Sequence, residues 1–220
     1  MKKPVKYIAN LIVRPLVQQY LSRTRIYKFE SLQLVIPPEV FHPGLFFSTK
    51  FLLKYLAQLP LKNKTFLELG AGSGLISFKA AILGANVTAT DINPVAIKYL
   101  EKNCQSNNIT LCVVLSDLFA DIQDKTFDVI AINPPYYKKD PVSFADHAWY
   151  CGENGEYFTN LFKELPLHIH STSTVLMVLS DECDLHMISS IATAHGLQLQ
   201  QVAAKRMFAE TNFIFQIIPG

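Results

Sequence analysis

Hydrophobic and polar positions follow two different spacings in the first part of the chain. Apolar residues recur at roughly helical spacing between Val5 and Leu21, which predicts an amphipathic helix that Pro15 kinks or divides. Residues 26–36 alternate between apolar and polar side chains, as an extended segment does, until the pair Pro37-Pro38 ends the pattern. A helix followed by an extended segment is therefore expected here.

The rest of the chain alternates between strand and helix patterns. Ser48 can cap a helix that runs to about Leu59, and Asn93 can cap another helix with Pro94 at its first position. Short apolar, β-branched runs are typical of central parallel strands that are covered on both faces. The predicted strands span residues 65–69, 86–91, 111–116, 127–132, 175–180, 197–203 and 212–218, and the other helices span residues 75–83, 94–104, 155–165 and 184–195.

This order of elements predicts an α/β fold, a Rossmann-like doubly wound sheet of seven strands with a short N-terminal extension. No helix separates the last two strands, so we expect a mostly parallel sheet with a terminal antiparallel strand. Residues 1–45 are expected to form an N-terminal arm, and residues 46–220 the Rossmann-like domain. In sheets of this kind the ligand lies at the carboxyl ends of the strands.

Charge is distributed unevenly between these two parts. Residues 1–29 carry seven of the 20 Lys and Arg residues and no acidic residue, which leaves 13 basic and all 18 acidic residues for the remainder. Clustered positive charge is the electrostatic footprint of a phosphate-bearing partner such as nucleic acid or the ribosome. A solvated helix face carries similar charges, so both interpretations of the arm stay open.

Composition excludes several classes of protein. The chain has 220 residues, of which 50% are hydrophobic and 17% charged, so we expect one catalytic domain with its own core. No C-x-x-C pair occurs among Cys104, Cys112, Cys151 and Cys183, which argues against a metal site and a disulfide framework. Neither a stretch of ~20 apolar residues nor a signal-peptide cleavage site is present, so a cytoplasmic location without a membrane partner is expected.

A glycine-rich turn, ELGAGSG, lies where the first strand of the domain leads into a helix. It comprises Glu68 and the alternating glycines Gly70, Gly72 and Gly74. Glycines at this spacing let the backbone pass close to a ligand without Cβ clashes. Dinucleotide enzymes use similar turns, and the glycines would also allow tight packing of strand on helix without any ligand.

Two aspartates follow the next two strands. Asp91 ends the second strand, where its carboxylate can accept hydrogen bonds from both hydroxyls of a ribose. This position favours a ribose-containing cofactor, either NAD or S-adenosylmethionine. Asp117 ends the third strand and can bind an adenine amino group, with Ile92 and Leu118 on the two faces of the ring; a turn-capping role for Asp117 is the alternative.

The tetrapeptide Asn133-Pro134-Pro135-Tyr136, directly after the fourth strand, favours S-adenosylmethionine over NAD. A planar NH2 group has a delocalised lone pair, so it must be held and polarised before it can attack a methyl group. The side-chain oxygen of Asn133 and the carbonyl of Pro134 can do this, and the prolines fix their positions. Tyr136 offers a flat face for stacking. These residues predict an N-methyltransferase. The alternative is that the tetrapeptide is an ordinary proline-rich turn after a strand.

These motifs resemble those of the HemK-type protein-glutamine methyltransferases and related small-domain N-methyltransferases. The resemblance covers roughly residues 40–220 and rests on ELGAGSG, Asp91-Ile92-Asn93-Pro94, Asp117-Leu118-Phe119, INPPY, residues 152–158, and Arg206 with Glu210. It implies that the glycine-rich turn, Asp91 and Asp117 bind S-adenosylmethionine, and that residues 133–136 recognise the substrate amide. The arm is shorter than the family's N-terminal domain, and residues 154–156 read Asn-Gly-Glu where the family has a D-G-L pattern.

Several functional hypotheses follow from these residues. The first is a methyltransferase whose acceptor is a protein glutamine, as in a release factor. The second keeps the chemistry but takes the exocyclic amine of adenine or guanine in RNA or DNA, with Tyr136 stacking on the base. An NAD-dependent oxidoreductase would more often show G-x-G-x-x-G, and a non-catalytic subunit would not need these motifs.

Two further segments are expected to lie near the predicted site. His42 precedes the first strand of the domain, where it is a candidate to close over the cofactor, although a His beside Pro is more often a surface turn residue. The segment Tyr137-Lys138-Lys139 follows the tetrapeptide, and its lysines would suit an acidic or phosphate-bearing substrate or form a solvated edge.

Overall fold

The computed structural model describes residues 19–45, 47–122, 125–207 and 210–220. The helix predicted between Val5 and Leu21 lies almost entirely outside these residues, as do the four basic residues of the arm that precede residue 19. The division of the chain at residue 45 and the role of the arm therefore stay predictions.

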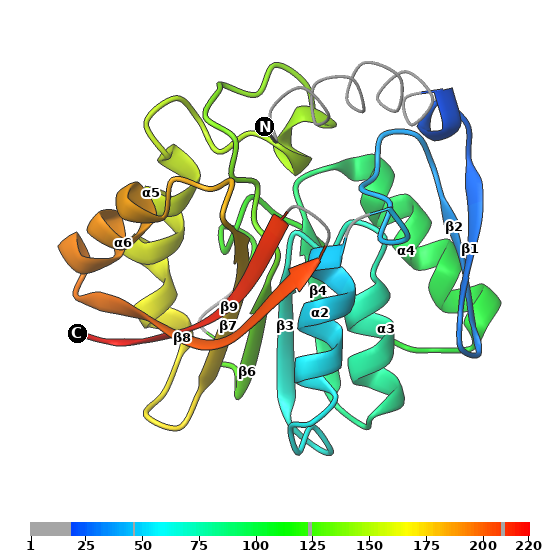
Figure 1. The fold of residues 1–220 in the computed structure, drawn as a ribbon. Coiled ribbons are helices and arrows are strands. Elements are labelled where there is room, and N and C mark those ends of the chain that lie inside the picture. The colour runs from blue at the N-terminus through cyan, green and yellow to red at the C-terminus, as the bar shows by residue number, and fades with distance from the viewer. Residues whose placement is uncertain (1–18, 46, 123–124, 208–209) are drawn as a thin grey trace.

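A seven-stranded sheet forms the centre of the molecule, with the strand order β5-β4-β3-β6-β7-β9-β8 (Figure 1). The strands are β3 (Thr65–Leu69), β4 (Asn86–Asp91), β5 (Cys112–Leu115), β6 (Val129–Ile132), β7 (Thr174–Ser180), β8 (Leu197–Met207) and β9 (Glu210–Pro219). The first five run parallel, β9 is antiparallel to β7, and β8 is antiparallel to β9. The predicted α/β fold class and the antiparallel ending are thus confirmed.

Helices cover both faces of the sheet (Figure 1). They are α2 (Phe47–Leu56), α3 (Leu75–Ile82), α4 (Pro94–Asn107), α5 (Glu156–Glu164) and α6 (Leu185–Ala194), with short 3-10 turns η1 (Asp146–Ala148) and η2 (Leu165–His168). Neighbouring strand residues point to opposite faces, so Phe66 packs with α2, α3 and α4 while Leu67 packs with α5 and α6. The apolar run of β6 is therefore a strand buried on both sides, as predicted. The same prediction for residues 111–116 was wrong, because β5 is the edge strand of the sheet and its Cys112 and Leu115 are exposed.

Helix caps follow the sequence signals only in part. The side chain of Asn93 caps α4 as predicted, accepting a hydrogen bond of 2.9 Å from the amide of Val95. Helix α2 begins at Phe47, so Ser48 lies inside its first turn and is not the residue before the helix. The prediction of Ser48 as a cap placed the start of this helix too late.

Residues 25–36 form a hairpin where the sequence predicted one extended segment. Strands β1 (Arg25–Phe29) and β2 (Leu32–Ile36) are antiparallel, and the turn between them holds Glu30 at a φ of 50°. The polar groups of β2 are satisfied by helix α4, because the carboxamides of Asn103 and Asn107 each exchange two hydrogen bonds with the β2 backbone. These two side chains take the place of a neighbouring strand in hydrogen bonding to β2, and they attach the hairpin to the domain.

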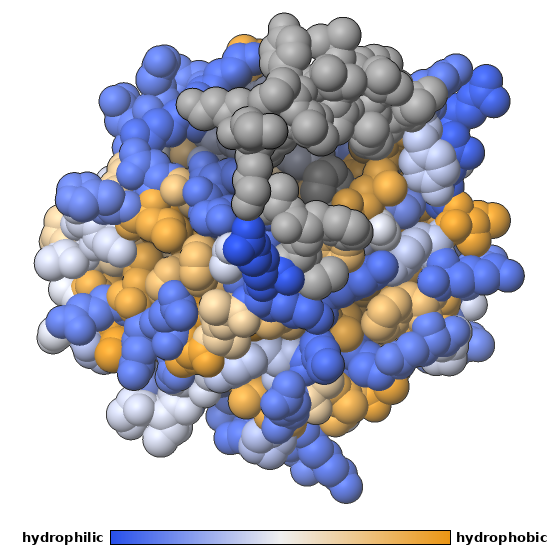
Figure 2. Space-filling view, viewed as in Figure 1, coloured by the Kyte–Doolittle hydropathy of each residue, from blue (hydrophilic) through white to orange (hydrophobic). Residues whose placement is uncertain are grey.

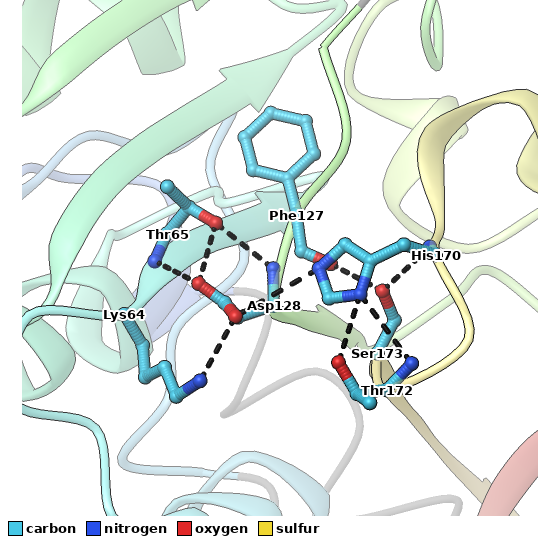
Figure 3. A network of polar contacts seen from close by, with 7 residues as sticks. All are labelled: Lys64, Thr65, Phe127, Asp128, His170, Thr172 and Ser173. Carbon is cyan, nitrogen blue, oxygen red and sulfur yellow. Dashed lines mark hydrogen bonds and ion pairs between the residues drawn. The ribbon is translucent and has the colours of Figure 1, made fainter.

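A polar network ties three strands together at the edge opposite their carboxyl ends (Figure 3). Asp128, just before β6, accepts hydrogen bonds from the amide and hydroxyl of Thr65 at 2.8 and 2.9 Å, and from Lys64 at 3.0 Å. These hydrogen bonds lower the pKa of Asp128 to about 2. His170, before β7, adds a 3.7 Å contact, and Ser173 donates to the carbonyl of Phe127 at 2.6 Å. The network fixes the relative starts of β3, β6 and β7.

Polar and apolar side chains are interspersed over the face seen in Figure 2. Among the described residues, no helix is long and apolar enough to cross a membrane. All four cysteines are unpaired, and the thiol of Cys151 is buried.

Candidate active site

A cavity of about 490 Å³ lies at the carboxyl ends of β3, β4, β5 and β6. This is the edge at which doubly wound sheets bind their ligands. All residues predicted for the site except Gly74 line this cavity. The lining residues among them are Glu68, Gly70, Gly72, Asp91, Ile92, Asp117, Leu118, Asn133, Pro134, Pro135 and Tyr136. The fold thus brings together residues that are widely spaced in the sequence, while their individual roles stay predictions.

The carboxylate of Asp91 is held from both sides by backbone amides. Gly72 donates to one oxygen at 2.7 Å and Asn93 donates to the other at 2.8 Å. Burial raises the pKa of Asp91, while these two hydrogen bonds oppose the shift. Each oxygen has a further lone pair for a ligand hydroxyl, which suits the predicted ribose contact.

Glu68 braces the glycine-rich turn from within the protein. Its Oε2 accepts a 2.8 Å hydrogen bond from the Ser77 amide and a 2.5 Å hydrogen bond from the Ser77 hydroxyl, which joins β3 to α3. Burial raises the pKa of Glu68 to about 8, an effect increased by the charge of Asp91 and opposed by Ser77. Glu68 also lines the cavity, so it can serve both the turn and a ligand.

The glycines of the turn have different reasons to be glycine. Gly72 lines the cavity with a φ of 52°, in the left-handed region that favours glycine, and its amide holds Asp91. Gly74 lies outside the cavity lining, and a Cβ there would come within 2.3 Å of a methyl carbon of Leu100. Gly74 therefore allows α3 to pack closely on α4, and its contact with a cofactor stays a prediction.

Asp117 lines the cavity and its side chain is exposed. The turn-capping role considered for Asp117 is taken instead by Ser116, whose buried hydroxyl donates to the carbonyl of Leu118 and accepts from the amide of Asp121, both at 3.0 Å. Leu118 itself has a φ of 50°, a conformation that is costly for a non-glycine residue. Ser116 thus holds the predicted adenine site in shape, a role that sequence reasoning missed.

Asn133 follows β6 and points its carboxamide into the cavity region lined by α2. Its Nδ2 donates a 3.4 Å hydrogen bond to Oγ1 of Thr49, a buried residue of α2 that also lines the cavity. Pro134 and Pro135 are buried, and their peptide bonds are trans, so the turn after Asn133 is firmly packed. The hydrogen bond and the two prolines hold Asn133 at the cavity wall.

The aromatic end of the tetrapeptide is packed as well. The rings of Tyr136 and Tyr137 lie 4.8 Å apart between centroids, and both residues line the cavity. Burial raises the pKa of the Tyr136 hydroxyl, so it stays protonated near neutral pH. Lys138 forms an ion pair with Asp184, and neither Lys138 nor Lys139 lines the cavity.

Tyr157 is a second residue that sequence reasoning did not single out. It stands at the start of α5 and lines the cavity. Burial, followed by the charges of Asp117 and Asp91, raises the pKa of its hydroxyl, and both carboxylates line the same cavity. In the sequence, the motif at residues 152–158 is the signal that contains it.

In residues 152–158 a carboxylate stands at Glu156, whereas the D-G-L pattern of the family would place one at residue 154. The side chain of Glu156 accepts hydrogen bonds from both the amide and the Nδ2 of Asn154. Gly152 has a φ of 87°, in the left-handed region that favours glycine, and a Cβ there would lie 2.0 Å from Glu156 Oε2 unless that side chain moved. The Asn-Gly-Glu sequence therefore forms an internally bonded start to α5.

His42 does not take the predicted position over the cavity. Its ring is buried edge-on against Tyr20 and Tyr27, and its Nδ1 accepts a 3.2 Å hydrogen bond from Gly44. The neighbouring Phe41 and Leu45 line the cavity instead. The segment borders the site, but the histidine packs behind it.

These features define a class of protein. A carboxylate anchored by two amides at the end of β4, beside a glycine turn, fits a ribose-bearing cofactor, and an Asn-Pro-Pro-Tyr turn in the same cavity fits a planar nitrogen. Together with the parallel sheet and its antiparallel C-terminal pair, they place the chain among the class I S-adenosylmethionine-dependent methyltransferases.

Comparison with known proteins gives the family. The chain belongs to the methyltransferase small domain family, whose model matches residues 31–148. A Methanocaldococcus jannaschii protein, provisionally named a protein N5-glutamine methyltransferase, is 35% identical over 161 residues, which cover 70% of this chain and 79% of that protein. The ribosomal protein L11 methyltransferase of Thermoanaerobacter pseudethanolicus is 29% identical over 60% of this chain, which spans 42% of its length.

Solved structures share the fold. The E. cuniculi Mtq2-Trm112 complex, described as responsible for methylation of the translation termination factor eRF1, superposes with a TM-score of 0.63 and 19% identity, covering 83% of this chain and 99% of that chain. The T. thermophilus 16S rRNA N2 G1207 methyltransferase, in complex with AdoMet and guanosine, gives a TM-score of 0.63 and 16% identity, covering 88% of this chain and 50% of that chain.

From its family, the protein is an S-adenosylmethionine-dependent methyltransferase.

Proposed function

We propose that the protein methylates the side-chain amide nitrogen of a glutamine in another protein. The observation that carries this proposal is the Asn133 carboxamide at the cavity wall, whose Nδ2 donates to Thr49. With Nδ2 engaged there, Oδ1 is the atom left to receive an N–H of the acceptor. A planar NH2 group is the kind of acceptor that such an oxygen holds.

The residues of the site divide the work between cofactor and acceptor. Asp91, Asp117 and the glycine turn hold the cofactor, and S-adenosylmethionine supplies an electrophilic methyl group on its sulfonium sulfur. The Asn133 oxygen and the Pro134 carbonyl accept the two N–H hydrogens of the acceptor and fix the nitrogen for attack. A nitrogen–carbon bond forms as the sulfur–carbon bond breaks, and the proton leaves the nitrogen once it carries the methyl group, so no strong base is required.

The charge of the cavity favours a protein acceptor over a nucleic acid. The lining side chains with acidic groups are Glu39, Glu68, Asp91, Asp117, Glu182 and Glu210, and no Lys or Arg of the described residues lines it. Proteins bind nucleic-acid phosphates chiefly through Lys and Arg, which neutralise the backbone. The 35% identical relative named for glutamine methylation supports the same choice.

The experiment that tests this proposal follows a radiolabelled methyl group from S-adenosylmethionine into a cell extract. We expect the label to be lost on protease digestion and to survive nuclease digestion. Asn133→Ala is the matched control and should leave the extract unlabelled, because it removes the acceptor oxygen while sparing Asp91. Label that is sensitive to nuclease would overturn the proposal and make a nucleic-acid base the acceptor.

A further inference from the structure

We infer that Thr49 is a positioning residue that holds the Asn133 carboxamide in its working orientation; the inference rests on the proposed function. Thr49 lies on α2, before the glycine-rich turn and 84 residues from Asn133 in sequence. Its side chain is buried, with 6% of the residue exposed, and it lines the same cavity. The fold thus delivers a hydroxyl from a separate element to the predicted acceptor-binding group.

The chemistry of a carboxamide makes its orientation decisive. Its oxygen accepts hydrogen bonds and its nitrogen donates them, yet the two ends have nearly the same size and shape. If the nitrogen of Asn133 faced an acceptor NH2, two donors would meet and the acceptor would not be polarised. In the structure the Thr49 hydroxyl accepts a 3.4 Å hydrogen bond from Nδ2, so the nitrogen lies on the α2 side of the site and the hydroxyl holds the carboxamide in place.

The length of this hydrogen bond suits a group that is set before its substrate arrives. Hydrogen bonds of catalytic groups are often long in the free protein and shorten in the substrate complex. Helix α2 is itself firmly placed, because Leu52, Leu53 and Leu56 are buried in the core beside the sheet. A hydroxyl on a rigid helix is therefore a suitable anchor for a side chain on the loop after β6.

The test compares Thr49→Val, which keeps the shape but removes the hydroxyl, with Thr49→Ser, which keeps the hydroxyl. Methyl transfer to the proteins of a cell extract is measured over a range of S-adenosylmethionine concentrations, and cofactor affinity is measured by calorimetry. We expect Thr49→Val to lower kcat by roughly 10- to 100-fold, the loss typical of a misplaced catalytic group. The KM and affinity for S-adenosylmethionine should be unchanged, and Thr49→Ser should recover most of the rate.

Two controls separate positioning from a structural effect. Thr193→Val makes the same change on α6, where the hydroxyl donates to the helix backbone at 2.9 Å, and should leave transfer at the wild-type rate. Melting temperatures are the second control and identify a variant that has not folded. If Thr49→Val does not fold, Thr49→Ala replaces it as the variant without the hydroxyl and is compared with Thr49→Ser.

The inference is overturned if Thr49→Val transfers methyl groups at the wild-type rate, or if it weakens S-adenosylmethionine binding in proportion to its loss of rate. Failure of the proposed function has a different signature, since wild-type label would then enter nucleic acid. In that case the same variants are compared on the labelled nucleic-acid fraction, where the kcat ratios decide the role of Thr49.

Discussion

Buried carboxyl groups dominate the site at the level of single residues. Glu68 and Asp91 are both buried on the neighbouring strands β3 and β4, and burial raises the pKa of both. A carboxylate is costly to bury unless hydrogen bonds or charges compensate it. Asp91 accepts hydrogen bonds from two backbone amides. Among the described residues, only Ser77 donates hydrogen bonds to the side chain of Glu68. The two acids should therefore respond differently to substitution.

Glu68→Gln is predicted to change how stability depends on pH. The folded-state pKa of Glu68, about 8, lies above its ordinary value of 4.5, so its favourable contribution is complete below pH 4.5 and is lost as the pH rises through 8. Glutamine can accept the same hydrogen bonds from Ser77 without ionising. The wild type should therefore lose stability relative to Glu68→Gln over this window, by at most about 1.4 kcal/mol per pH unit. Denaturant unfolding at several pH values measures the difference, and parallel stability curves would contradict the assignment.

Asp91→Ala is predicted to remove most of the affinity for S-adenosylmethionine. The substitution deletes the acceptor for a ribose and also releases the amides of Gly72 and Asn93. A hydrogen bond to a charged group contributes about 1.5–3 kcal/mol, so we expect affinity to fall by roughly ten- to a hundredfold or more. Calorimetry measures this loss directly. Asp121→Ala is a suitable control, since this exposed residue is not part of the cavity lining and should leave affinity unchanged. Equal affinity for Asp91→Ala and wild type would exclude Asp91 from the cofactor site.

At the level of elements, the β1–β2 hairpin and the segment after it are attached to helix α4 beside the site. Asn103 and Asn107 fasten its second strand to α4, and Asn93 donates a 3.0 Å hydrogen bond to the carbonyl of Glu39, just beyond that strand. The next two residues, Val40 and Phe41, line the cavity. Helix α4 therefore holds both the hairpin and one wall of the cofactor site.

Asn103→Leu is predicted to loosen this attachment. Asn103 is buried, and its loss leaves the amide and the carbonyl of Val35 without their partners, at about 1–3 kcal/mol for each unpaired group. Asn107→Leu is the matched control and should cost less, because its contacts with Gln33 are exposed to solvent. Hydrogen exchange at the Val35 amide should accelerate in Asn103→Leu and change little in Asn107→Leu. Unchanged protection in both variants would show that the hairpin is held by its apolar side chains alone.

The sequence predicted the parts of the molecule whose signals are local. The buried strands are continuous apolar runs, the cap of α4 is an Asn-Pro pair, and the residues of the predicted site follow strands whose ends meet at one edge of a sheet. The hairpin was missed because residues 26–36 alternate without a strong turn signal, and the turn depends on Glu30 at positive φ. Thr49 and Ser116 were missed because their roles come from contacts that only the folded chain creates.

For the molecule as a whole, the sheet separates two cores and exposes one functional edge. Helices α2, α3 and α4 belong to one core and α5 and α6 to the other, and both groups contribute residues to the cavity. Thr49 comes from the first group and Tyr157 from the second. Helices of both cores therefore line the cavity, whereas the sequence motifs predicted only its central part.

In the proposed function, the Asn133 turn directs a methyl group onto a glutamine amide. The most direct measurement digests the protein labelled by the enzyme to free amino acids and identifies the methylated residue by mass spectrometry, with Asn133→Ala as the control. We expect N5-methylglutamine in the wild-type reaction and none in the variant. Methyl groups found only on lysine or another amino group, or N5-methylglutamine formed at the same level by Asn133→Ala, would contradict it.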